Sequence, residues 1–224
     1  MNRMHRLFSI LRQRTINITQ RKYFKVLKTV IETLKVDLNT FLATTGNERA
    51  KVVLVSVDRG GSVPTTIIDY SLGSFSKEKR TSRKLSISRL NLPLSTRDSK
   101  QGETNVEALT KVKANINQIL HPTKLHYGRP IRIYVIDDLL DSGATLDLIV
   151  RSFKDETWYK QVKFVFLYHT VDRDKQGFLR STHEFLPPFF TLDWVIHSLV
   201  AAKQLVIGKT LKTNKWLDFW YEKM

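Results

Sequence analysis

Cysteine is absent from the 224 residues of this chain. Disulfide bonds and thiolate metal sites are therefore excluded, and a reducing compartment is compatible with the composition. The six histidines are scattered without the spacing of metal ligands, so no zinc site is expected. The sequence also lacks a run near the roughly 18 apolar residues of a membrane span, and it contains neither a Walker pattern nor a Ser-His-Asp arrangement.

Acidic residues are few: 21 Asp and Glu stand against 37 Lys and Arg, which gives a net charge of +16. Such a charge attracts polyanions, a class that includes nucleic acid, phosphorylated metabolites and acidic membrane surfaces. The basic residues gather in two stretches, 1–31 and 73–102, which read as terminal or loop segments. With 42% hydrophobic residues, the chain is long enough for one domain with a sizeable core.

The most informative stretch runs from residue 131 to residue 146. Its first six residues are mostly β-branched or aromatic, which predicts a short buried strand. The strand is expected to end in acid, at Asp137, Asp138 and Asp141. A small turn then leads into an apolar helix start, and its residues are Ser142, Gly143, Ala144 and Thr145. The pattern predicts a loop at the carboxyl end of a strand, where open α/β sheets bind their ligands.

The residue types in this loop suit a phosphorylated sugar. A small, hydroxyl-bearing turn at a helix amino terminus offers backbone N–H groups and hydroxyls to a phosphate. Two adjacent carboxylates can accept hydrogen bonds from a vicinal diol or hold a hydrated Mg²⁺. Asp141, at the start of the turn, is placed for proton transfer. Each residue alone is also an ordinary turn or N-cap residue, so the prediction depends on the ordered set.

A second loop follows another predicted strand. The apolar run 52–57 is ended by Asp58, Arg59, Gly60 and Gly61, and a helix is expected to open at residues 63–68. A glycine pair lets the backbone approach a ligand closely, and the guanidinium of Arg59 suits an oxyanion. Both loops therefore predict an anionic, phosphate-bearing ligand.

Together the two loops resemble those of the type I phosphoribosyltransferases. The first matches the phosphoribosyl-pyrophosphate (PRPP) signature, an apolar strand that ends in two acidic residues and leads into Asp-Thr/Ser-Gly-x-Thr. The second is similar to the pyrophosphate loop, a strand followed by Arg-Gly-Gly-x-x-Pro. The resemblance covers residues 20–199, and the xanthine-guanine and hypoxanthine-guanine branch is the closest in layout.

The resemblance, with the alternation of strands and helices, implies an α/β fold with a doubly wound, mostly parallel sheet, helices on both faces and a small hood. The expected organisation is a basic arm (1–19), a phosphoribosyltransferase domain (20–200) and a basic aromatic tail (201–224). Within the domain, residues 73–102 are expected to form a mobile lid over PRPP, or else a disordered insertion.

The resemblance also implies a role for each loop residue. Asp137 and Asp138 would bind the ribose hydroxyls and Mg²⁺, and Asp141 would also act as the general acid/base at purine N7. The 5′-phosphate would lie in the turn formed by Ser142, Gly143, Ala144 and Thr145. Pyrophosphate would bind at Arg59 and Gly60.

The base is expected in the hood segment 186–199, where Trp194 and Val195 would cover a purine; taken alone, Trp194 would read as a core residue. Two positions depart from the family pattern. His169 lies where a lysine usually recognises the 6-oxo group, and Val200 lies where an acid usually reaches the metal.

The sequence thus predicts an enzyme that moves phosphoribose from PRPP to a nucleobase, with Mg²⁺, releasing pyrophosphate in nucleotide salvage. A 6-oxopurine acceptor (xanthine, guanine or hypoxanthine), a homodimer or tetramer and a cytoplasmic location are expected; the alternative for residues 1–19 is a mitochondrial presequence. The competing hypothesis is a PRPP-responsive regulator that binds nucleic acid on the same fold, which the charge of +16 favours.

Overall fold

The computed structural model describes residues 15–44, 50–57, 60–78, 85–94, 102–120, 130–141, 143–171, 192–213 and 216–223. Outside this description lie the first part of the basic arm, two parts of the expected lid and the start of the hood segment. The elements are β1 (Thr15–Ile18), α2 (Gln20–Thr44), β2 (Lys51–Val57), α3 (Ser62–Glu78), β3 (Ser86–Leu92), α4 (Gly102–Leu120), β4 (Ile131–Leu140), α5 (Ala144–Phe153), η2 (Tyr159–Gln161), β5 (Val162–Val171), α7 (Leu192–Ala201), β6 (Leu205–Lys212), β7 (Trp216–Phe219) and η4 (Trp220–Lys223). In this part of the chain, no helix combines the length and the apolar character needed to cross a membrane.

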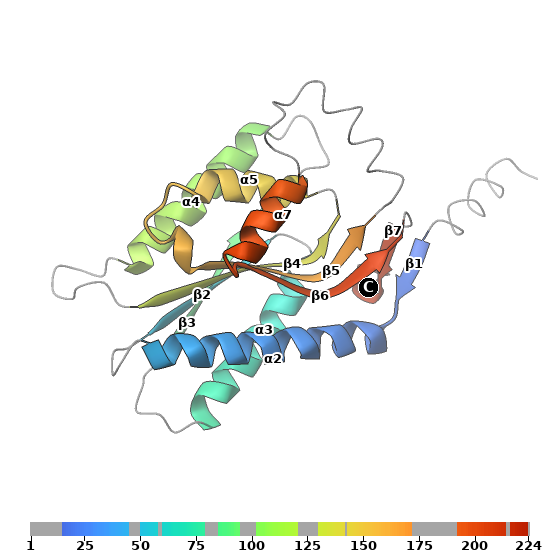
Figure 1. Ribbon diagram of the computed structural model, residues 1–224, viewed down its shortest axis with the longest axis horizontal. Coiled ribbons are helices and arrows are strands. Elements are labelled where there is room, and N and C mark those ends of the chain that lie inside the picture. Colours follow the sequence, from blue (N-terminus) through green and yellow to red (C-terminus); the bar gives the residue numbers. More distant parts are fainter. Residues whose placement is uncertain are drawn as a thin grey trace, which may run out of the picture.

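The described residues form a five-stranded sheet in the order β3-β2-β4-β5-β6, with every neighbouring pair parallel (Figure 1). From β2 the chain goes to β3 on one side and then returns to build β4, β5 and β6 on the other. The strand order therefore reverses between β2 and β4, which pair in register from Lys51 with Ile131 to Ser56 with Ile136. In such sheets the ligand crevice lies beyond the carboxyl ends of the two strands at the reversal.

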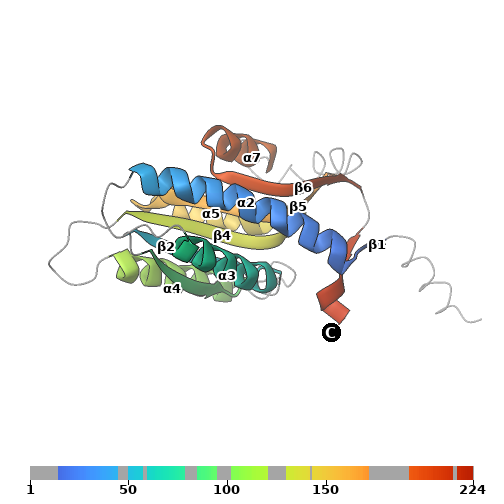
Figure 2. The ribbon, with the colours of Figure 1, turned by 90° about the horizontal axis from the view of Figure 1, so that it is seen from below.

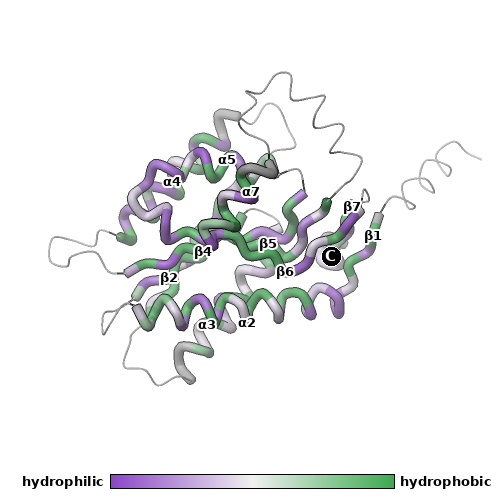
Figure 3. The backbone as a smooth tube through the Cα atoms, viewed as in Figure 1, coloured by the Kyte–Doolittle hydropathy of each residue, from purple (hydrophilic) through white to green (hydrophobic). Residues whose placement is uncertain are grey.

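Helices cover both faces of the sheet, as predicted (Figures 1 and 2). Alternate residues of each strand point to opposite faces, so Val52 and Leu54 of β2 join the core under α2 and α3. Val53 and Val55 join the other core, under α4, α5 and α7. Burial on both sides explains the apolar character of the central strands in Figure 3.

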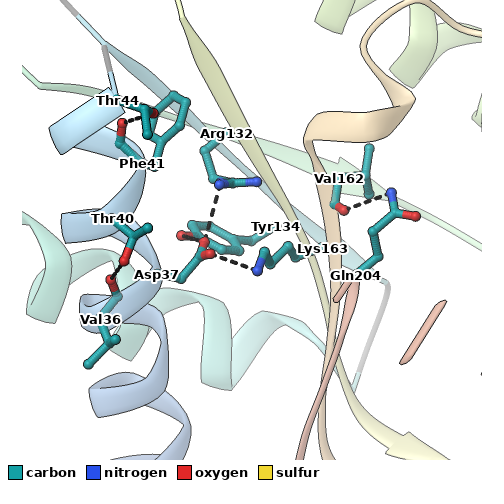
Figure 4. A network of polar contacts seen from close by, with 10 residues as sticks. All are labelled: Val36, Asp37, Thr40, Phe41, Thr44, Arg132, Tyr134, Val162, Lys163 and Gln204. Atoms are coloured by element: carbon teal, nitrogen blue, oxygen red, sulfur yellow. Dashed lines mark hydrogen bonds and ion pairs between the residues drawn. The ribbon is translucent and has the colours of Figure 1, made fainter. Parts of the chain in front are cut away.

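A charged cluster attaches α2 to the sheet at the end remote from the predicted loops (Figure 4). Asp37 of α2 forms ion pairs with Arg132 of β4, at 3.2 Å, and with Lys163 of β5, at 2.7 Å. The Tyr134 hydroxyl donates to the same carboxylate at 2.8 Å. All three charged side chains are between 13% and 16% exposed, so the cluster is largely shielded from solvent.

Three parts of the chain differ from expectation. Strand β4 continues to Leu140, so Asp137 and Asp138 lie within its last residues and not after it. Residues 205–212, expected in the tail, form the edge strand β6 of the main sheet. The end of the hood segment is helical, as α7.

A second, two-stranded sheet joins the ends of the described chain. Strand β7 pairs in parallel with β1, from Thr15 with Trp216 to Ile18 with Phe219. Leu217 and Phe219 are each 1% exposed, so the last residues pack in the core near the start of α2. Figures 1 and 2 show this small sheet beside the carboxyl ends of β5 and β6.

Candidate functional site at the carboxyl edge of the sheet

The two predicted loops meet at the reversal of the strand order. Gly60, in the turn after β2, lies against the acid pair of β4: a Cβ at Gly60 would stand 2.6 Å from Asp137 Oδ1 and closer still to Asp138 Oδ1. Gly61 is enclosed by backbone, with the Val57 carbonyl 2.5 Å from its ideal Cβ position. Neither position has space for a side chain, so both require glycine.

The acid pair has one buried and one more open member. Asp138 is 6% exposed, whereas Asp137 is only partly buried. Asp137 Oδ1 accepts a hydrogen bond from the Asp138 backbone N–H at 2.9 Å. Although Asp137 as a whole residue is only partly buried, its carboxyl group is desolvated, which raises its pKa well above the ordinary range, and the adjacent negative charge of Asp138 raises it further. A cation placed between the pair would relieve this repulsion.

Asp141 is held by a residue that the sequence did not suggest. The hydroxyl of Thr170, on the neighbouring strand β5, donates to Asp141 Oδ1 at 2.7 Å. Thr170 is 8% exposed, so this contact lies at the buried side of the loop. The hydrogen bond fixes the carboxylate of Asp141, the candidate general acid/base. In the sequence, the only sign of this role is that Thr170 carries a hydroxyl at the end of a strand.

The turn after β4 forms the amino end of α5. Gly143 is the N-cap residue and has a φ of 76°, a left-handed conformation that costs a residue with a Cβ about 1 kcal/mol or more. No side chain caps the helix at this residue. Ala144 and Thr145 follow in the first turn of α5, so the described part of the predicted phosphate turn has the geometry of a helix amino terminus.

Of the remaining predicted site residues, the structure describes the side chains of only some. Arg59 and Ser142 lie outside the described residues, and nothing is described of the Trp194 side chain. Val195 is 3% exposed and packs in the core between α7 and the sheet. His169 is half-buried on β5, in register with Leu140 and next to Thr170, and so lies at the site edge.

The C-terminal segment contributes a contact that sequence reasoning missed. The Tyr221 hydroxyl donates a hydrogen bond to Asp138 Oδ2. Tyr221 is 83 residues from Asp138 in the sequence, so no local sequence pattern predicts the contact. The aromatic content of the tail was the available signal, and it was compatible with a subunit interface as well as with packing on the domain.

The donor set fits a magnesium ion. Mg²⁺ prefers one or two carboxylates, with phosphate, hydroxyl or water oxygens completing its coordination shell. Among the described residues there is no group of three or more His, Cys, Asp or Glu that would form an all-protein cage. Asp137 and Asp138 therefore suit a hydrated, ligand-shared Mg²⁺ better than a structural metal.

The fold and the site define a doubly wound α/β protein in which a Gly-Gly turn and an acid-rich loop meet at the reversal of the strand order. A family model described as the phosphoribosyl transferase domain matches residues 31–184, more than half of the chain. The chain belongs to this family and is a phosphoribosyltransferase-type enzyme.

Solved structures that are similar to the chain include two phosphoribosyltransferases. Helicobacter pylori xanthine-guanine-hypoxanthine phosphoribosyltransferase has 13% sequence identity, 93% coverage of both chains and a TM-score of 0.39. The HGPRT-ase from Leishmania tarentolae in complex with GMP has 17% identity, covers 68% of this chain and 69% of its own, and has the same TM-score, 0.39. No curated protein matches the sequence. The family assignment rests on the family model alone.

Proposed function

We propose that the chain transfers the phosphoribosyl group of PRPP to a nitrogenous base and releases pyrophosphate, with a 6-oxopurine as the acceptor. The observation that carries this proposal is the contact of Gly60 with the carboxylates of Asp137 and Asp138 at the reversal of the strand order. This contact supports the proposal because it brings the pyrophosphate-type loop next to the ribose-type loop, as a ligand with a phosphate at each end of a pentose requires.

Each described residue has a role that suits this reaction. Asp137 and Asp138 would accept hydrogen bonds from the ribose hydroxyls, and the amino end of α5, from Gly143 to Thr145, would hold the 5′-phosphate. Mg²⁺ held by the acid pair would neutralise charge on the departing pyrophosphate. Arg59, by family resemblance, would bind that pyrophosphate.

Asp141 is the proposed general acid/base. A base nitrogen forms a bond to the anomeric carbon while the bond to pyrophosphate breaks, and both electrons of that bond leave with pyrophosphate. Asp141, held by Thr170 at 2.7 Å, would carry the proton at purine N7. His169, at the same edge, is the described candidate for contact with the base, and Trp194 stays a prediction.

A product assay tests the proposal. The full chain is incubated with labelled PRPP, Mg²⁺ and, separately, hypoxanthine, guanine, xanthine, adenine and uracil. A nucleotide is expected with a 6-oxopurine, and Asp141→Asn is expected to lower the rate by about 100-fold or more while PRPP binding persists. Product with none of the bases, or an Asp141→Asn variant with unchanged turnover, would refute the assignment.

A second candidate function is PRPP-responsive binding of nucleic acid. It is supported by the outer face of α2, where four basic side chains are exposed in the first turns with no acid among them: Arg21, Lys22, Lys25 and Lys28. Nucleic-acid affinity that falls steeply with salt and changes with PRPP would support this candidate. Absence of binding at low ionic strength would eliminate it.

A further inference from the structure

The C-terminal segment, residues 216–223, is fixed at the ligand edge of the sheet. Its strand β7 pairs with β1, which leads directly into α2. Leu217 and Phe219 anchor it in the core at 1% exposure each. The segment is therefore part of the folded domain at the place where Figure 1 shows it, beside the carboxyl ends of the strands.

Aromatic rings from the C-terminal segment and from α2 contact Tyr221, and a ring from β5 packs behind them. Its ring stacks on Phe219, with centroids 5.6 Å apart and planes at 12°. The ring of Tyr23, from α2, meets it edge-on at 5.5 Å and 78°. Phe219 in turn contacts Tyr168 of β5 at 5.7 Å. Offset and edge-on pairs of this kind restrict ring position, so the Tyr221 hydroxyl has a defined location.

The hydroxyl engages one oxygen of Asp138, and the other oxygen lies against the second loop. Tyr221 donates to Oδ2, whereas Oδ1 lies beside Gly60, in the turn after β2. The Asp138 carboxylate is therefore held between the C-terminal segment and the Gly60 turn.

We infer that Tyr221 is a positioning residue of the phosphoribosyl site, which holds the buried Asp138 carboxylate against the Gly60 turn and so fixes how the two loops meet. This inference rests on the proposed function. It makes the C-terminal segment a third component of the site, besides the two loops that the family pattern contains.

The size of the effect follows from the chemistry of the contact. A hydrogen bond to a charged group contributes enough that its loss weakens an equilibrium about tenfold or more. Without it, a carboxylate that is 6% exposed would settle in another orientation, and the diol would lose a fixed acceptor. Turnover at saturating PRPP should change less than twofold, because Asp141 is held separately by Thr170.

The test uses four versions of the full chain besides the wild type: Tyr221→Phe, Asp138→Asn, the double variant and the control Tyr70→Phe. Tyr221→Phe removes the hydroxyl and retains the stacked ring. Tyr70 is 78% exposed on α3, so its substitution measures the general effect of losing a phenol. PRPP affinity in the presence of Mg²⁺ is measured by calorimetry, and turnover is measured at saturating PRPP and base.

We expect the PRPP dissociation constant to be about tenfold higher for Tyr221→Phe and unchanged for Tyr70→Phe. In the Asp138→Asn background, adding Tyr221→Phe should cause no additional loss of PRPP affinity. Unchanged affinity would overturn the inference. Tighter binding would also overturn it, because the tail would then compete with the ligand. An equal loss in the Asp138→Asn background would show that Tyr221 acts through packing. If the wild type itself binds no PRPP, the proposed function fails. If the wild type binds PRPP and Tyr221→Phe binds it with the same affinity, only the inference about Tyr221 fails.

Discussion

A methyl group added at Gly60 should uncouple the two loops of the site. The added Cβ would stand 2.6 Å from Asp137 Oδ1, which is 0.8 Å short of the 3.4 Å at which ordinary contact begins, and it would be closer still to Asp138 Oδ1. The acid pair or the turn must therefore move by about 1 Å. A displacement of that size at a reacting group costs on the order of 100-fold in rate, so kcat/KM for PRPP should fall by about that factor in Gly60→Ala. Overpacking should cost about 1–3 kcal/mol of unfolding free energy.

Two other glycines provide matched comparisons. Nothing lies within 4 Å of a Cβ built at Gly73, in α3, so Gly73→Ala should keep its activity and gain about 0.5–1 kcal/mol of stability. At Gly61 the neighbours are backbone carbonyls that cannot turn away, so Gly61→Ala should lose the fold. Steady-state kinetics and urea unfolding of the three variants are the measurements. If Gly60→Ala is as active as Gly73→Ala, the two loops do not form one site.

Three further changes test other contacts. Thr170→Val removes the donor to Asp141 at nearly constant volume, and kcat should fall about tenfold with little change in PRPP affinity; an unchanged kcat would show that Asp141 needs no support. Asp37→Asn leaves two shielded cations without their counterion, so the unfolding free energy in urea should fall by about 3 kcal/mol, and a loss below 0.5 kcal/mol would show that solvent screens the cluster. Burial raises the pKa of Tyr168 to about 12, above the ordinary value of 10, so the unfolded chain ionises first and stability is lost as pH rises from 10 to 12. The loss relative to Tyr168→Phe should reach about 2 kcal/mol at pH 12, and parallel stability curves for the two proteins would contradict it.

The elements with continuous apolar runs could be predicted from the sequence. Strands β2, β4 and β5 are buried on both faces, and an apolar composition of this kind indicates a parallel sheet between helices. The start of α5 was also predictable, because Gly143 and the small residues around it identify a turn at a helix start.

The edge of the sheet was harder to predict. Strand β6 is only partly buried and contains Lys209 and Lys212, so its pattern resembles a solvated tail. Its identity as a strand depends on pairing with β5, and Gly208 lets α2 pack closely there, since a Cβ at Gly208 would stand 2.6 Å from Val26. Such a dependence on distant residues is not visible in a local window.

The acids of the site were identified from the sequence, whereas the residues that support them were not. Asp137, Asp138 and Asp141 stand in one recognisable run, but Thr170 and Tyr221 reach them from β5 and from the C-terminal segment. The two hydrogen bonds join residues that are 29 positions and 83 positions apart in the sequence. The topology of the fold determines such contacts, and the pattern of a single sequence does not reveal them.

The central claim is that the acid pair and the Gly60 turn bind a pentose with phosphates at both ends. Calorimetric titration of the full chain with PRPP and Mg²⁺ tests it most directly, with the variant in which Asp137 and Asp138 are both changed to Asn as the comparison. A saturable heat that the wild type gives and the double variant loses is the predicted result. No heat from the wild type, or equal heats from the two proteins, would contradict the claim.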